Sequence, residues 1–344
     1  MTRRELLWLT AAGLLSGAEP QNLSYPLRSL EGTVTPSDMF FVRDHFQPPE
    51  LSLGTWSLRI EGRVEHPYEL NFSDLVELPS QKFEAFLECA GNPANGSAIS
   101  NGVWEGAPMS ALLKAARPAT DAVFVLLEGA DRGRLFPDRP SLPYTQIVPL
   151  EKCMDASSLV AYRLNGLALP KKNGFPARAL LAGWYGMDSV KWLQRILLLN
   201  RDAAQTAFEQ SGMNRVYNRV DKNQTTRLSA VQVKSAMAWP GDGARLPSAR
   251  HLLWGFAWSG RAPIRHVEVT TDGGKQWMPA DLSSRPAQCA WTRWTYAWTA
   301  KPGEYVLMSR AADQSGAQQP LQRDPLRKDR YELNWCAPVH CLVR

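Results

Sequence analysis

The sequence has few cysteines, and none of them lies in a spacing that holds haem or zinc. Five cysteines occur among 344 residues, without a C-x-x-C pair or a C-x-x-C-H haem-attachment motif. We therefore expect no covalently bound haem and no zinc site in this chain. An odd number of cysteines leaves at least one thiol unpaired. Cys336 and Cys341 lie five residues apart, and the sequence leaves open whether they form a disulfide or stay reduced in the core.

Charge is spread thinly along the chain. No run of five or more like charges occurs, and the formal net charge is +6 at pH 7. This mild basic excess suits an anionic substrate or an acidic partner protein, but it is too diffuse to indicate nucleic-acid binding. We therefore predict no nucleic-acid partner.

Long hydrophobic runs are also missing. The apolar stretch near the amino terminus is too short to span a bilayer comfortably, so we predict no stable membrane span. This stretch follows Arg3 and Arg4 and ends in small residues at Ser16 and Ala18, which is the arrangement of a twin-arginine export signal. Residues 1–18 are therefore predicted to direct the folded protein to the periplasm. The alternative is an ordinary amphipathic helix.

The composition is that of a globular protein with more than one core. Hydrophobic residues make up 44% and charged residues 21% of the chain, and its length indicates two domains. In residues 19–220, strand-like and helix-like segments alternate without a regular βαβ repeat, which favours an α+β domain. One short helix is expected to start at Ser73 and another to cover residues 110–116. The predicted strands are residues 82–88, 122–127, 159–164, 179–181 and 190–199.

The pattern changes near residue 220. From Ala230 onward the segments are short, alternate between apolar and polar residues, and are separated by turns. Residues 264–270 form the clearest strand, and Asp272-Gly273-Gly274 after it is typical of a hairpin turn. Many strands with almost no helical periodicity indicate an immunoglobulin-like sandwich over residues 221–344.

One short stretch raises a question of chemistry. In FLECAGN, residues 86–92, Cys89 stands at the end of an apolar run and is followed by turn residues. An inert buried cysteine needs no such setting, whereas a thiolate that must reach a metal or a substrate does. Cys89 is therefore the first candidate for a functional residue.

Together with this stretch, several others resemble the sulfite oxidase family of molybdenum enzymes. The similarity runs in order through nearly the whole chain after residue 18. The resemblance implies a molybdopterin-binding α+β domain, a Mo-molybdopterin cofactor and a sandwich that forms a homodimer. The matching stretches are MFFVRDHFQPP at 39–49, LECAGN at 87–92, WEGAPM at 104–109, AYRLNG at 161–166, NGFPAR at 173–178, SVKWL at 189–193 and VEVTTDGGKQW at 267–277.

In this family the cysteine of the CAGN motif binds molybdenum, so the resemblance implies that Cys89 is the metal ligand. A soft thiolate suits a transition metal that a pterin already holds through dithiolene sulfurs. Arg43 is implied to face the metal centre, where a guanidinium can hold an oxyanion by two charge-assisted hydrogen bonds. The alternatives are an inert thiol at Cys89 and a surface ion pair between Arg43 and Asp44 or Asp38.

The resemblance also implies the remaining site residues. Trp104 is expected to form part of the wall of the substrate pocket, and the alternative is a tryptophan buried in the core. Tyr217 is the nearest candidate for a tyrosine beside the metal, although it lies a few residues after the position that the family pattern gives. A buried phosphate requires basic groups, hydroxyls and backbone N–H donors. Without the resemblance, the charged residues among the pterin ligands are ordinary charges near strand ends, and the histidine is a core residue. The residues implied to bind the pterin and its phosphate, with Arg43, are Phe41, Val42, His45, Asp131, Asn173 (a histidine in the family), Arg178, Ser189, Val190 and Lys191.

The chain departs from the family pattern where the substrate is concerned. Pro93 and Ala94 stand where many members carry arginines, one of which lines the anion pocket. Asp188 replaces an arginine and would repel an anion if it faced the site. The terminal segment from Tyr331 to Arg344, together with Arg330, is a candidate source of a replacement cation, with Arg330 and His340 as the named residues.

The sequence therefore predicts a molybdenum-dependent oxidoreductase that transfers an oxygen atom to a small sulfur-containing anion, oxidising sulfite to sulfate. Because the chain has no haem motif, the electrons are expected to pass to an external carrier such as a c-type cytochrome. Two alternatives stay open. The same cofactor can act on a sulfane sulfur or a sulfoxide, which the missing arginines would suit, or the chain is a non-catalytic, export-associated binding protein.

Overall fold

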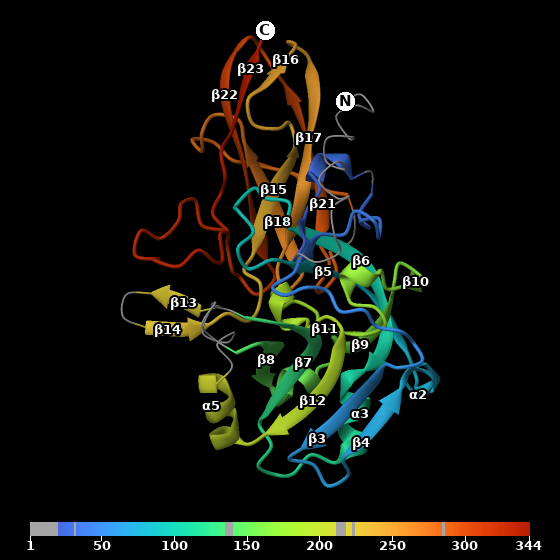
Figure 1. The fold of residues 1–344 in the computed structure, drawn as a ribbon. Coiled ribbons are helices and arrows are strands. Elements are labelled where there is room, and N and C mark those ends of the chain that lie inside the picture. The colour runs from blue at the N-terminus through green and yellow to red at the C-terminus, as the bar shows by residue number, and fades with distance from the viewer. Residues whose placement is uncertain (1–19, 31, 135–139, 211–217, 222–223, 284–285) are drawn as a thin grey trace.

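The computed structural model describes residues 20–344 apart from 31, 135–139, 211–217, 222–223 and 284–285. Two regions built mainly of strands lie one above the other (Figure 1). We call the part up to α5 (Arg201–Gln210) the N-terminal region and the part from β15 (Lys234–Trp239) onward the C-terminal region. Among the helices described, none is both long and apolar enough to cross a membrane.

The first sheet of the N-terminal region ends at the candidate cysteine. β5 (Gln81–Glu88) pairs antiparallel with β6 (Ile99–Pro108), and the last register pair is Glu88 with Ile99. β6 continues to β9 (Ser158–Leu164), which also pairs with β10 (Leu167–Ala168) and β11 (Arg178–Leu181). The predicted strand 82–88 is confirmed, and Cys89 is the first residue beyond the β5–β6 ladder.

The second sheet packs its apolar face against the first. Its strand order is β4 (Tyr68–Asn71), β3 (Ser57–Gly62), β12 (Leu193–Leu199), β7 (Phe124–Gly133) and β8 (Leu142–Pro149). Alternate residues of these strands, among them Leu58, Val125 and Ile196, share one buried cluster with side chains of β9 and β11. This core fixes the loops that leave the two sheets, and these loops form the site.

Helices are few and short in the N-terminal region. In α3 (Met109–Ala116) the buried residues fall at helical spacing, which is why this segment packs on the sheets. α2 (Phe72–Glu77) begins one residue earlier than predicted, because Asn71 caps it in a reciprocal capping box with Asp74. The other helical segments are η2 (Leu27–Ser29), α4 (Leu150–Met154), η3 (Lys171–Asn173), η4 (Gly186–Asp188) and α5. The predicted mixture of strands and short helices is confirmed, with strands predominating.

The C-terminal region has two sheets that enclose a second hydrophobic core. The predicted strand 264–270 is β18, and the predicted turn joins it to β19 (Met278–Pro279) in an antiparallel hairpin. One sheet is β15, β17 (Arg250–Trp258), β21 (Thr292–Thr299) and β20 (Asp281–Leu282); the other is β16 (Ala244–Leu246), β23 (Val339–Val343), β22 (Gly303–Asp313), β18 and β19. The two-sheet arrangement agrees with a sandwich, and its immunoglobulin-like classification stays a prediction.

The remaining strands form two short pairs. β1 (Asn22–Leu23) pairs with β2 (Val42–Arg43), which places Arg43 beside Asn22. β13 (Asn218–Asp221) pairs with β14 (Gln224–Arg227) between the two regions of the chain.

The two regions touch next to the Cys89 strand. Phe256 of β17 stacks on Trp291 with ring centroids 4.1 Å apart, and both belong to the same buried cluster as Leu27 of η2. The backbone N–H of Phe86 in β5 donates to the carbonyl of Cys289 at 2.8 Å. All five cysteines are free thiols, so Cys336 and Cys341 are not bridged.

Candidate active site

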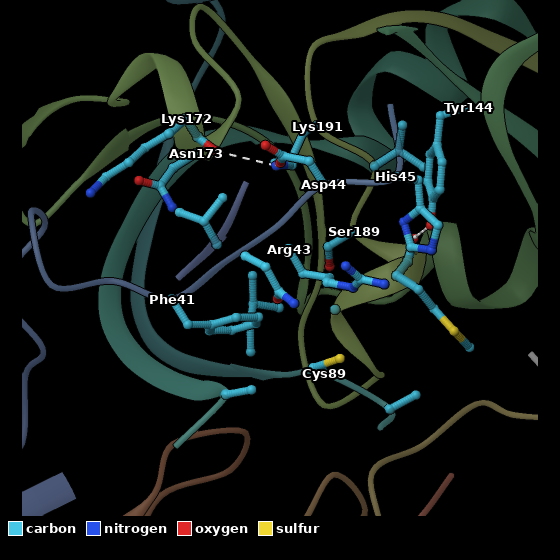
Figure 2. A pocket seen from close by; sticks show the side chains of 18 of the residues that line it. Phe41, Arg43, Asp44, His45, Cys89, Tyr144, Lys172, Asn173, Ser189 and Lys191 are labelled. Atoms are coloured by element: carbon cyan, nitrogen blue, oxygen red, sulfur yellow. Dashed lines mark hydrogen bonds and ion pairs between the residues drawn. The ribbon is translucent and has the colours of Figure 1, made fainter. Parts of the chain in front are cut away.

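A cavity of about 450 Å³ lies where β2, the turn after β5 and the η3 and η4 loops converge. In Figure 2, Cys89 and the Lys191–Asp44 pair occupy opposite ends of this cavity, and Phe41, Arg43 and Ser189 lie between them. The predicted residues that line it are Phe41, Val42, Arg43, His45, Cys89, Asp131, Asn173, Arg178, Ser189, Val190 and Lys191.

Cys89 is held by a tight turn and remains partly accessible. Its N–H donates to the carbonyl of Ala98 at 2.9 Å, and its own carbonyl accepts from the N–H of Asn92 at 2.9 Å. Burial raises the pKa of the thiol, while the N–H of Gly91 and the charge of Arg43 act in the opposite direction. A bound cation would favour the thiolate, so this sulfur is suited to holding a metal.

Arg43 lines the cavity with an exposed side chain, and its positive charge acts on the thiol of Cys89. Asp44, a predicted alternative partner of Arg43, is instead bound by Lys191, and the backbone carbonyl of Asp38 accepts from Lys172. The charge of Arg43 lowers the pKa values of both Cys89 and Tyr331, although burial raises each of them overall. An anion that enters this end of the cavity meets a guanidinium rather than a neutralised ion pair.

The opposite end holds a buried ion pair. Lys191 donates to Asp44, whose side chain is fully buried and also accepts from the N–H of Gln21 at 3.0 Å. Burial lowers the pKa of Lys191 to about 8, with Asp44 opposing the shift. His45 lies close by, and burial together with the charges of Arg43 and Lys191 lowers its pKa to about 4. His45 is therefore neutral near pH 7.

Two buried acceptors face the cavity without a partner among the described residues. They are Oδ1 of Asp131 and Oδ1 of Asn173. Burial raises the pKa of Asp131 to about 7, because the charged carboxylate is poorly solvated there, while the charge of Lys191 opposes this shift. Gly174 after Asn173 has φ +111°, so the chain turns there in a conformation that glycine adopts readily. Both acceptors call for a ligand that carries N–H donors.

Arg178 and Ser189 tie the cavity walls together. The guanidinium of Arg178, 4% exposed, donates to the carbonyls of Asn173 at 2.9 Å and Ser189 at 2.6 Å. Burial lowers its pKa to about 9. The hydroxyl of Ser189 accepts from the N–H of Leu181 at 3.0 Å and keeps its own proton to donate. Arg178 thus fixes both loops as well as lining the cavity.

Family models and relatives agree with this geometry. Residues 45–207 match the oxidoreductase molybdopterin binding domain, and residues 225–328 match the Mo-co oxidoreductase dimerisation domain. Chicken sulfite oxidase is 30% identical over 91% of this chain and 74% of its own length.

The chain belongs to the sulfite oxidase family.

Other members of the sulfite oxidase family extend the comparison. Mouse mitochondrial sulfite oxidase is 30% identical over 89% of this chain, which spans 61% of the mouse protein's length. The crystal structure of the sulfane dehydrogenase SoxCD from Paracoccus pantotrophus superimposes with a TM-score of 0.83 at 30% identity, covering 92% of this chain and 83% of that one.

The cavity fits the molybdopterin cofactor of the family. The unpartnered oxygens of Asp131 and Asn173 match the N–H donors of a pterin edge, and Lys191 with the Ser189 hydroxyl can hold its phosphate. Cys89 would bind the metal. Among the described residues, no cluster of three or more histidine, cysteine or carboxylate side chains could hold a metal ion.

The prediction that Trp104 walls the pocket is wrong. Trp104 is 0% exposed and absent from the cavity lining, and its indole N–H donates to the carbonyl of Ala85 at 3.0 Å. Its ring packs edge-on against Phe40 at 5.4 Å and lies 5.4 Å from the guanidinium carbon of Arg178. The β5–β6 ladder turns this side chain into the core, where it supports Arg178.

The predicted replacement cations are also wrong. Neither Arg330 nor His340 lines the cavity, and His340 lies 3.1 Å from an oxygen of Asp242 at the surface of the C-terminal region. Asp188 does not face the cavity either, since it is fully buried and ion-paired with Arg227.

The C-terminal region contributes Tyr331, which sequence reasoning missed. Tyr331 lines the cavity, and the N–H of the next residue, Glu332, donates to the carbonyl of Ala90 at 3.0 Å. Arg327 fixes this segment by binding Asp329 and Glu332. Tyr217, the predicted tyrosine, lies outside the described residues.

Asp44, Tyr144 and Lys172 also line the cavity and were not among the predicted ligands. Asp44 and Lys172 are neighbours of predicted residues in FVRDH and KKNGFP, so the motifs themselves could have drawn attention to them. Tyr144 lies 5.3 Å from the ring of His45, and no motif marks it.

Proposed function

We propose that this protein oxidises sulfite to sulfate with a molybdopterin-bound molybdenum and passes two electrons to an external carrier, a c-type cytochrome. The observation that carries the proposal is that a thiol, Cys89, and an available guanidinium, Arg43, line the same cavity as the unpartnered acceptors of Asp131 and Asn173, which suit the N–H donors of a pterin. The sulfite oxidases of mouse and chicken support the choice of substrate.

When bound, the cofactor supplies oxygen-atom transfer and accepts two electrons for each sulfite converted to sulfate with an oxygen from water. The chain's own residues would prepare that step. Arg43 binds the anion and turns its sulfur toward the metal, and Tyr331 at the same end offers a hydroxyl donor.

A second substrate class has a specific observation in its favour. Pro93 and Ala94 replace two arginines of the family, and no described residue of the terminal segment restores a cation at the cavity. One guanidinium suits a singly charged or bulkier substrate such as a sulfane sulfur carried on a thiol. The similarity to the Paracoccus pantotrophus sulfane dehydrogenase supports this alternative.

Location and assembly are part of the proposal. The twin-arginine pattern of residues 1–18 supports export to the periplasm, and it lies outside the described residues. The match of residues 225–328 to a dimerisation domain supports a homodimer. Light scattering of the purified protein would test the dimer, and fractionation of cells that express it would test the location.

The deciding experiment uses protein purified from a host that makes molybdopterin. We expect one molybdenum per chain and reduction of cytochrome c that depends on sulfite. Faster turnover with a persulfide would select the sulfane alternative, and turnover only with a sulfoxide would select the reverse reaction. Absence of molybdenum after such expression would contradict the enzyme and favour a binding protein.

A further inference from the structure

A buried ion pair joins the C-terminal region to the turn that carries Cys89. Lys234, the first residue of β15, is 1% exposed, and Glu88, the last residue of β5, is 3% exposed. Nζ of Lys234 lies 2.9 Å from Oε1 of Glu88. Trp258, the register partner of Lys234 across the β15–β17 ladder, donates its indole N–H to Oε2 of Glu88 at 2.8 Å. Residues of one strand pair, β15 and β17, thus bind both carboxylate oxygens of Glu88.

The ammonium of Lys234 is used completely in this arrangement. Besides Glu88, it donates to the carbonyl of Asn92 at 3.2 Å and to the carbonyl of Pro93 at 2.7 Å. An ammonium has three N–H donors, so none is left for a ligand. Its acceptors lie immediately before Cys89 and shortly after it. Lys234 therefore binds the chain on both sides of Cys89.

Asn92 links this ion pair to the turn that follows Cys89. Its Nδ2 donates to Oε1 of Glu88 at 2.9 Å, and its Oδ1 accepts from the N–H of Ala98 at 2.9 Å. Its backbone N–H donates to the carbonyl of Cys89 at 2.9 Å, and the N–H of Cys89 donates to the carbonyl of Ala98. A shift of the Lys234–Glu88 pair would move the peptide groups that orient the Cys89 side chain.

The energetics indicate that the Lys234–Glu88 ion pair orients the turn rather than holding the two regions together. Removing two charges from water is costly, and apolar side chains of similar volume often hold two sheets together as well or better. Apolar groups could not bind the buried carbonyl of Asn92, which would then lose this donor. Neither Lys234 nor Trp258 lines the cavity, so neither can contact substrate.

We propose that Lys234, acting with Glu88 and Trp258, is a positioning residue that holds the turn so that the thiol of Cys89 points into the cavity. The C-terminal region thereby fixes the direction of the metal–sulfur bond, in addition to any part in dimer formation. This inference rests on the proposed role of Cys89 as the metal ligand.

The test compares Lys234→Met with the unmodified chain, both full-length and loaded with cofactor. Amide hydrogen exchange at Cys89, Asn92 and Ala98 should become about tenfold faster or more, because the turn opens locally. The Mo(V) electron paramagnetic resonance spectrum after dithionite reduction should become broader or split, since the thiolate takes more than one orientation. Arg310→Met is the matched control: it removes an ion pair to Glu268 (2.7 Å) elsewhere in the C-terminal region and should change neither readout.

Trp258→Phe keeps the argument testable if Lys234→Met fails to fold, because it removes one hydrogen bond and little volume. It should accelerate the same exchange by about threefold, a smaller effect than loss of the cation. A variant with a lower melting temperature but wild-type exchange in the turn and a wild-type spectrum would overturn the positioning role. The exchange result does not depend on turnover, so it separates this inference from the proposed function, which Cys89→Ala tests.

Discussion

The two ends of the cavity differ in what they offer a ligand. The Lys191 end is buried and rich in charge, with an ion pair to Asp44 and two unpartnered acceptors nearby. The Cys89 end is partly open and carries one available guanidinium, Arg43, and a tyrosine hydroxyl from the C-terminal region. A buried, charged pocket suits a tightly bound pterin, whereas a half-open end suits a substrate that must enter and leave. Each substitution predicted below changes one end of the cavity and leaves the other end intact.

Cys89→Ala should have the largest effect, because it removes the proposed protein bond to the metal. We expect loss of sulfite oxidation to the background rate, with the fold and much of the pterin binding retained. Steady-state kinetics, pterin fluorescence and circular dichroism measure the three properties. Cys153→Ala, which empties a buried and catalytically remote position, serves as the control for general damage. Turnover that survives in Cys89→Ala would remove the metal–thiolate bond from this account.

Lys191→Met should damage the opposite end. It leaves Asp44 buried without its cation, which costs about 3–5 kcal/mol of unfolding free energy, and it should release the cofactor. Chemical denaturation and molybdenum content report the two effects. Lys171→Met is the matched control, since Lys171 pairs with Glu50 at 3.0 Å with both side chains exposed, and it should change stability by less than about 1 kcal/mol. Full cofactor occupancy in Lys191→Met would contradict the phosphate role.

Arg43→Gln should act on the substrate end alone. Loss of a charge-assisted hydrogen bond costs about 1.5–3 kcal/mol, so KM for sulfite should rise roughly ten- to a hundredfold. KM for a neutral sulfoxide, measured in the reverse direction, should change much less. Arg63→Gln, which removes an exposed ion pair to Asp121, should leave both values unchanged. Equal increases for sulfite and sulfoxide in Arg43→Gln would argue against anion recognition.

Tyr331→Phe should give the smallest change. A neutral hydrogen bond contributes about 0.5–1.5 kcal/mol, so kcat/KM for sulfite should fall about two- to tenfold with cofactor content unchanged. Tyr305→Phe provides the control, because that ring packs on Trp298 at 4.8 Å in the C-terminal core. An unchanged kcat/KM in Tyr331→Phe would place this tyrosine outside the substrate end.

The sequence predicted best where function depends on a local motif. FVRDH, LECAGN and SVKWL placed Arg43, Cys89 and Lys191 at one cavity, because each motif lies at a junction of strand and loop. The first two motifs lie where β2 and β5 end, and SVKWL leads into β12. The prediction for Trp104 was wrong because the side of a strand that faces the core depends on the neighbouring strand. The sequence shows the alternation but not which face is covered.

Long-range contacts were beyond sequence reasoning. Tyr331 lies in a segment without periodicity, and contacts distant in sequence, such as the bond from Glu332 to Ala90, hold it at the cavity. Lys234 and Glu88 are 146 residues apart, and each looks like an ordinary strand charge until folding buries them together. The position of Cys89 was predictable, whereas the contacts that orient it depend on how the two regions dock.

The most direct measurement is X-ray absorption at the molybdenum edge of the loaded protein and of Cys89→Ala. The account predicts one more sulfur neighbour around molybdenum in the unmodified protein than in the variant. The same number of sulfur neighbours in both proteins would show that the metal is held without this thiolate, and the proposed function would lose its foundation.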